Sequence, residues 1–79
     1  MKIKNSYNYN IIFRPEPEGG YTVLVPAFPG CVTYGHTLVE ARQMAKDAIR
    51  AYIASLKKHR DPIPNDNETF VSSLNLAHA

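Results

Sequence analysis

Two clusters of proline and glycine set the strongest limit on what this chain can fold into. Residues 15–20 read PEPEGG and residues 26–30 read PAFPG. Proline removes a backbone donor from a β-ladder, and glycine supplies the positive φ that tight turns need. The clusters therefore divide the first part of the chain into short segments that suit strands joined by turns.

Each segment between these turns has the composition of a β-strand. Alternation of apolar and polar side chains over residues 7–14 predicts a half-buried strand that stops at Pro15. Residues 21–25 predict a second strand, so that residues 7–25 form a hairpin with a loop of about six residues. Residues 31–34 predict a short third strand. The apolar positions of the first strand are Tyr7, Tyr9, Ile11 and Phe13.

A helical pattern follows Gly35. Thr37 is a candidate N-cap, and Glu40 three residues later completes a capping box. The apolar side chains that follow fall within an arc of roughly 100°, which predicts a helix over residues 38–58 with one face toward a core. These positions are Leu38, Ala41, Ala45, Ala48, Ile49, Tyr52 and Leu56.

The remainder of the chain predicts a polar connector and one more strand. Residues 61–67 contain two prolines and no regular apolar spacing, whereas residues 68–76 place Phe70, Leu74 and Leu76 on one side of an extended segment. A helical crossover would lay this fourth strand parallel to a neighbour. We therefore expect an α+β fold in the order βββαβ, with a mixed sheet and one helix on one face. The other face of the sheet would be left for a second subunit.

Length and cysteine content limit the biology as well as the fold. The chain has 79 residues, which we interpret as a single domain over residues 1–79. A domain of this size buries only about 60% of its unfolded surface, which favours self-association as a dimer or tetramer. Cys31 is the only cysteine, which is typical of a reducing compartment. Because no signal peptide or membrane-spanning run is recognisable, we expect a cytoplasmic protein that does not enter a membrane.

Four short motifs together resemble the N-terminal domain of HicB-type antitoxins. They are the GGY hairpin within residues 18–23, the P-x-x-P-G-C loop within residues 25–35, the G-x-T-x-x-E-A helix start that ends at Ala41, and the P-I-P connector at residues 62–64. The motifs occur in the family's order at compatible spacing and cover about residues 7–64. A single motif would be weak, whereas four in order are specific.

The resemblance implies both a fold and a role. The fold would be a degenerate ribonuclease-H-like domain with sheet order 3-2-1-4, and the role would be to bind and occlude a HicA-type RNA-cleaving toxin. Such steric inhibition needs no cofactor. The family's use of the sheet and its loops points to Tyr21, Phe28, Pro29 and Tyr34 as partner contacts.

Two features depart from the longer family members. The sequence stops before a C-terminal DNA-binding domain, so direct DNA binding is not expected. Its net charge is +2, whereas relatives that neutralise basic toxins are often acidic.

The candidate catalytic residues do not form a recognisable site. Metal-dependent nucleases need several carboxylates that converge on two ions, but the first three predicted strands contain no Asp or Glu. Cys31 and His36 could form a thiol–imidazole pair, although no third residue is visible to orient the imidazole. The spacing of the three histidines matches no metal motif. We therefore predict neither an enzyme nor a metal site.

A basic stripe on the predicted helix leaves two further functions open. Arg42, Lys46 and Arg50 lie on one side of the helix and could contact phosphates. The simpler interpretation is a solvated face whose long side chains cover apolar surface. The alternatives to an antitoxin are thus a stand-alone homo-oligomeric scaffold without a toxin and a weak nucleic-acid binder.

Overall fold

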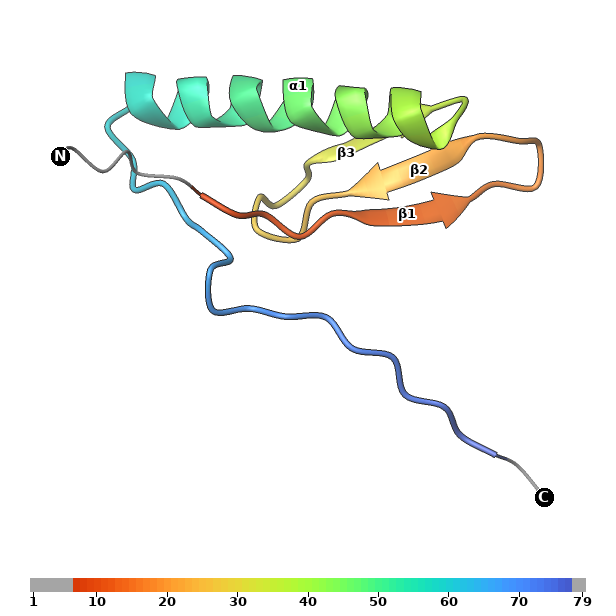
Figure 1. The fold of residues 1–79 in the computed structure, drawn as a ribbon. Coiled ribbons are helices and arrows are strands. Elements are labelled where there is room, and N and C mark those ends of the chain that lie inside the picture. The colour runs from red at the N-terminus through yellow and green to blue at the C-terminus, as the bar shows by residue number, and fades with distance from the viewer. Residues whose placement is uncertain (1–6, 78–79) are drawn as a thin grey trace, which may run out of the picture.

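The computed structural model describes residues 7–77 and consists of a three-stranded antiparallel sheet with one helix across it. The strands lie in the order β1-β2-β3, and the helix covers one face of the sheet (Figure 1). The predicted α+β class is confirmed. The elements are β1 (Ile12–Pro15), β2 (Tyr21–Leu24), β3 (Val32–Gly35) and α1 (Leu38–Lys58).

The two predicted turns join the strands. In the first, the amide of Glu16 donates to the carbonyl of Gly20, and the amide of Gly19 donates to the carbonyl of Glu16. Gly20 has a φ of 79°, and a Cβ there would overlap the hydroxyl of Tyr34. This position therefore needs glycine for two reasons: the backbone conformation and the neighbouring ring.

The helix begins and ends where the sequence predicts. Thr37 is its N-cap, and the Thr37 hydroxyl accepts a hydrogen bond from the amide of Glu40 at 3.1 Å. The Glu40 carboxylate in turn accepts from the amide of His36 at 2.7 Å, one residue before the position that a standard capping box uses. The first bond satisfies an amide that the start of a helix leaves without a partner, and the second fixes the residue that precedes the cap.

The core lies between α1 and the strands. Val23 is fully buried against Ala41 and Ala45 of the helix. These two alanines let the helix approach the sheet closely, and Gly35 allows the closest approach. A Cβ at Gly35 would overlap the backbone nitrogen of Ala41.

A second part of the core is aromatic. Phe28, which is 1% exposed, stands between Tyr9 and Tyr52, with ring centroids 4.9 and 4.7 Å away. Val25 and Cys31 complete this cluster. The P-x-x-P loop thus folds inward and anchors the C-terminal half of α1 to the end of the sheet.

The first strand is shorter than predicted. The alternation begins at Tyr7, but β1 pairs with β2 only from Ile12 onward, where Ile12 lies opposite Leu24. The chain beyond Val25 turns at Pro26, so residues 7–11 have no strand opposite them on that side. These residues are extended without being part of a ladder.

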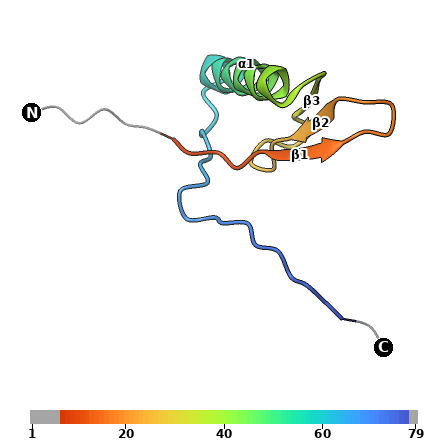
Figure 2. The same ribbon diagram turned by 45° about the vertical axis from the view of Figure 1, so that its right-hand side comes forward.

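The predicted fourth strand is not formed within residues 66–77. The connector does reach β1's side of the sheet, because the amide of Asp66 donates to the carbonyl of Asn8 at 3.0 Å. Immediately afterwards the amide of Thr69 donates to the carbonyl of Asp66, which closes a turn. The turn directs the following residues away from the sheet (Figures 1 and 2). The order 3-2-1-4, which needs that strand, is therefore absent from this structure.

Candidate functional site

One face of the sheet is left uncovered by the described part of the chain. Ile12, Leu24 and Val32 lie side by side across the three strands on the face opposite α1. Ile12 is 38% exposed and Val32 is 56% exposed. In Figure 2 the helix lies on the other side of the sheet. The three side chains form an apolar row that can contact a partner without any movement of the fold.

Tyr34 stands on the same face and is held in place. It follows Val32 by two residues on β3, so its side chain points to the same side of the sheet. Its hydroxyl donates to the carbonyl of Gly19 at 2.8 Å, and its ring meets the edge of the His36 ring at 5.3 Å. Because the ring is already fixed and is 40% exposed, it would lose little conformational freedom on binding.

The other three predicted contact residues are placed differently. Tyr21 is half-buried and packs against the core on the helix side of the sheet. Phe28 lies inside the core, so it offers no surface to a partner in this structure. Pro29 is exposed, and its carbonyl accepts a hydrogen bond from the hydroxyl of Tyr52 at 3.2 Å. Only Pro29 and Tyr34 are therefore exposed, and Tyr34 lies on the uncovered face.

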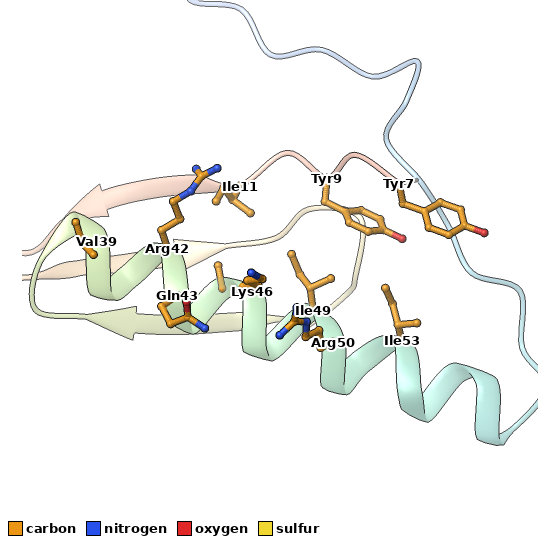
Figure 3. A pocket seen from close by; sticks show the side chains of 11 residues that line it. Tyr7, Tyr9, Ile11, Val39, Arg42, Gln43, Lys46, Ile49, Arg50 and Ile53 are labelled. Carbon is orange, nitrogen blue, oxygen red and sulfur yellow. The ribbon is translucent and has the colours of Figure 1, made fainter. Parts of the chain in front are cut away.

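A groove runs along the opposite side of the molecule, between α1 and the chain that leads into β1. Its volume is about 640 Å³. Figure 3 shows the rings of Tyr7 and Tyr9 across the groove from Ile49 and Ile53 of the helix. The groove arises because α1 packs over β2 and β3 and leaves space beside β1. The full lining is Tyr7, Tyr9, Ile11, Val39, Arg42, Gln43, Ala45, Lys46, Ile49, Arg50 and Ile53.

The basic stripe predicted from the sequence forms one rim of this groove. Arg42, Lys46 and Arg50 are all exposed and line it from successive turns of α1. The groove is therefore apolar along its inner surface and positively charged along its rim. The basic residues in the last turn of α1, Lys57 and Lys58, do not line it.

Two tyrosines in the groove were not among the predicted site residues. The rings of Tyr7 and Tyr9 stack at 6.3 Å, and the Tyr9 hydroxyl donates to the carbonyl of Pro64 at 2.7 Å. Burial raises the pKa of Tyr9 above its usual value, with smaller contributions from Tyr7 and Asp66. The alternation of the first strand predicts that these residues share a side with Ile11. It does not reveal that the helix stands far enough away to leave a groove there.

The candidate catalytic residues are not brought together. Cys31 precedes β3 and is buried with Val25 and Phe28, whereas His36 follows the other end of the strand and contacts Tyr34. Burial raises the pKa of the Cys31 thiol, which lowers its thiolate content. Over residues 7–77 no three His, Cys, Asp or Glu side chains gather as metal ligands would. No helix in that range is both long and apolar enough to span a bilayer.

Comparisons of the sequence with family models and with known proteins agree on one family. Residues 9–76 match the model of the HicB_like antitoxin of bacterial toxin–antitoxin systems. A UPF0150 protein of Thermoplasma acidophilum is 54% identical over 59 residues, which cover 75% of this chain and 86% of that protein. A UPF0150 protein of Synechocystis is 38% identical over 64 residues, with 81% of each chain covered. Antitoxin HicB of Escherichia coli is 44% identical over 41 residues, which cover 52% of this chain and 30% of HicB. The chain belongs to the HicB-like antitoxin family.

Proposed function

We propose that this protein is an antitoxin that binds a HicA-type RNA-cleaving toxin and occludes its active site with the uncovered face of the sheet. The observation that carries the proposal is the apolar row of Ile12, Leu24 and Val32, which the described chain leaves uncovered, with Ile12 and Val32 exposed, on a member of an antitoxin family. The similarity to antitoxin HicB supports the same role. Because such a toxin acts on RNA inside the cell, the complex would form in the cytoplasm.

The inhibition follows from shape and needs no chemistry of its own. A short sheet backed by a helix presents a rigid surface, so little ordering is needed when the partner docks. Burial of Val32 and Ile12 would each contribute about 1–2 kcal/mol, because part of each side chain is already buried. Tyr34 adds a ring whose hydroxyl is already hydrogen-bonded. A toxin held against this face cannot admit RNA at the covered site.

The test starts with an affinity pull-down of the tagged protein from its native host, at moderate salt and with nuclease-treated lysate. The expected result is a small basic protein at near-stoichiometric amount, which cleaves RNA when purified alone and is inhibited when this chain is added. Recovery of the tagged chain by itself would favour the homo-oligomeric scaffold. A co-purified protein whose RNA cleavage is not inhibited would contradict the proposal.

Single substitutions then test whether the toxin binds the uncovered face of the sheet. Val32→Asp should weaken toxin inhibition by roughly 100-fold, because a carboxylate replaces the most exposed apolar contact of the row. Met44→Asp is the matched control, since Met44 is 41% exposed but lies on α1, on the other side of the sheet. Equal losses for the two variants would contradict the assignment to the uncovered face.

A weak interaction with nucleic acid is the second candidate function. The feature that favours it is the presence of Tyr7 and Tyr9 in the same groove as Arg42, Lys46 and Arg50, since bases stack on aromatic rings while cations hold phosphates. Binding to single-stranded RNA should then fall steeply between about 50 and 200 mM salt. An interaction that depends on the apolar row would change little over that range.

A further inference from the structure

The C-terminal segment exposes more apolar surface than a stable single chain would leave in water. Phe70 is 83% exposed, Val71 65%, Leu74 85% and Leu76 75%. All lie within residues 70–76, which extend away from the body of the protein (Figure 1). Several large apolar side chains on one short extended segment are typical of a segment that binds another surface.

The connector holds the start of this segment beside residues 8–10 of its own chain. The amide of Asn10 donates to the Asp66 carboxylate at 3.0 Å, and its side-chain amide donates to the carbonyl of Thr69 at 3.3 Å. The amide of Asn8 donates to the side chain of Asn67 at 3.1 Å. These bonds hold both sides of the turn at residues 66–69. The segment therefore starts from a fixed point, and in this structure it extends away from the sheet (Figures 1 and 2).

A surface that fits the segment is present on the body of the protein. The outer edge of β1 (Ile12–Pro15) pairs with no strand within residues 7–77, so its outward backbone groups are open to an added strand. The backbone groups of Asn8 and Asn10, which precede β1, are already bonded to residues 66 and 67. The groove lies beside this edge, with Ile11, Ile49 and Ile53 along its inner surface (Figure 3). An extended segment could therefore pair its backbone with the edge of β1 and pack its side chains into the groove.

The lengths of the segment and the groove agree. Lining residues of the groove run along α1 from Val39 to Ile53, which at about 1.5 Å per residue corresponds to roughly 21 Å. Residues 70–76 in strand conformation span roughly 20 Å at about 3.3 Å per residue. Alternation then places Phe70, Leu74 and Leu76 on one side and Val71 on the other.

The charges of the two surfaces are compatible. Residues 70–76 carry no charged side chain, and Asp66 and Glu68 precede them in the turn. The groove presents Arg42, Lys46 and Arg50, and no acidic side chain lines it. A basic partner would meet repulsion at this rim, whereas this uncharged apolar segment would not.

From these observations we infer that two copies of the chain exchange their C-terminal segments. Residues 70–76 of each copy add a fourth strand at the outer edge of β1 of the other copy and place Phe70, Leu74 and Leu76 in its groove. The two contacts are identical and related by a two-fold axis, which closes the assembly at a dimer. The sheet of each copy then has the order 3-2-1-4, with its last strand supplied by the partner.

This exchange leaves the proposed toxin surface accessible. The groove lies on the helix side of the sheet, whereas Ile12 and Val32 lie on the other. The dimer and the toxin complex can therefore form independently, and failure of one does not imply failure of the other.

The first test is the mass of the full-length protein in solution, measured by size-exclusion chromatography with light scattering over a dilution series. The expected result is a dimer whose Kd rises roughly 100-fold in Leu74→Asp, because a carboxylate then enters the apolar groove. Val71→Asp is the matched control and should remain a dimer, since its side chain lies on the opposite side of the added strand. A monomeric wild-type protein, or a dimer that Leu74→Asp leaves intact, would overturn the proposal.

The second test separates exchange from folding back within one chain. Leu74→Cys and Gln43→Cys variants are prepared separately, mixed, and treated with a short bismaleimide; Cys31 remains in both, where burial protects it. Exchange predicts a covalent dimer in the mixture with Leu74→Cys and much less with Ser73→Cys in its place. The double variant in one chain should also link between chains. If it forms only internal links at every concentration, the segment binds its own groove and the proposal fails.

Discussion

The body of the protein and its C-terminal segment both carry apolar side chains at regular spacing, but only the body buries them. Phe28 and Val23 are almost fully buried under α1, whereas Phe70 and Leu74 are more than 80% exposed. The two regions do not differ in the pattern of their residues. They differ in whether a second surface of the same chain lies opposite. Apolar spacing identifies the side of an element that will be buried, and it does not identify what will cover it.

Removal of an aromatic ring from each region should give the largest difference between them. Phe28→Ala should lower the free energy of unfolding by about 3–5 kcal/mol, because it leaves a cavity between Tyr9 and Tyr52. Phe70→Ala should change it by less than about 0.5 kcal/mol in dilute protein, because the ring is in solvent. Urea denaturation followed by circular dichroism measures both.

The same pair tests the exchange of segments. At protein concentrations above the dimer Kd, Phe70→Ala should lose stability relative to wild type, because only the wild-type dimer is strengthened by mass action. A large loss of unfolding free energy in Phe70→Ala that does not depend on protein concentration would contradict the exchange. The ring would then be packed within its own chain.

The next effect concerns the close contact between β3 and α1. Gly35→Ala should cost about 2–3 kcal/mol, because the new Cβ overlaps the backbone of Ala41 and pushes the first turn of the helix outward. Gly30→Ala is the matched control: Gly30 has a φ of 76° and open space around it, so about 1 kcal/mol of backbone strain is the whole expected cost. Thermal or urea unfolding would compare the two. Equal costs would mean that the helix can shift freely over the sheet.

A smaller effect than that of Gly35→Ala is expected where the two regions meet. Tyr9→Phe removes the hydrogen bond from the Tyr9 hydroxyl to the carbonyl of Pro64 and should cost about 1 kcal/mol. The pKa of Tyr9 is raised by burial, so the folded protein holds this proton more tightly than the unfolded chain. The Tyr9 hydroxyl therefore makes its full contribution to the free energy of unfolding below about pH 10. This contribution falls as the pH rises through the pKa of the folded state.

That pH dependence gives a further measurement. Unfolding free energies of wild type and Tyr9→Phe should converge as the pH rises above about 10, because the phenolate cannot donate to Pro64. A difference that stays constant with pH would show that the hydroxyl does not contribute through this bond.

Local signals in the sequence were sufficient for most of the fold. The cap at Thr37 and the apolar arc that follows located the helix to the residue, and the two proline–glycine clusters located the turns. The fourth strand could not be predicted reliably, because its alternation is genuine while the turn that closes at Thr69 depends on contacts with Asn8 and Asn10, far away in the sequence.

The candidate site was only partly predictable for the same reason. Tyr34 was correctly expected on a strand, and strand alternation with Val32 fixes its side, but the side that the helix would cover was not known in advance. Phe28 sits in a loop, where no periodicity distinguishes an inward ring from an outward one. Tyr7 and Tyr9 line the same groove as the basic stripe only because of where α1 packs across the sheet, and strand or helix periodicity does not predict that position.

The missing side chain at Gly35 has an effect on the opposite side of the molecule. Because it lets α1 pack directly against β3, the helix lies toward the β3 side of the three-stranded sheet, and a single helix is too narrow to cover the β1 side as well. The groove beside β1 is thus a consequence of the close contact between β3 and α1. A larger residue at position 35 would separate β3 from α1, move the helix toward β1 and narrow the groove.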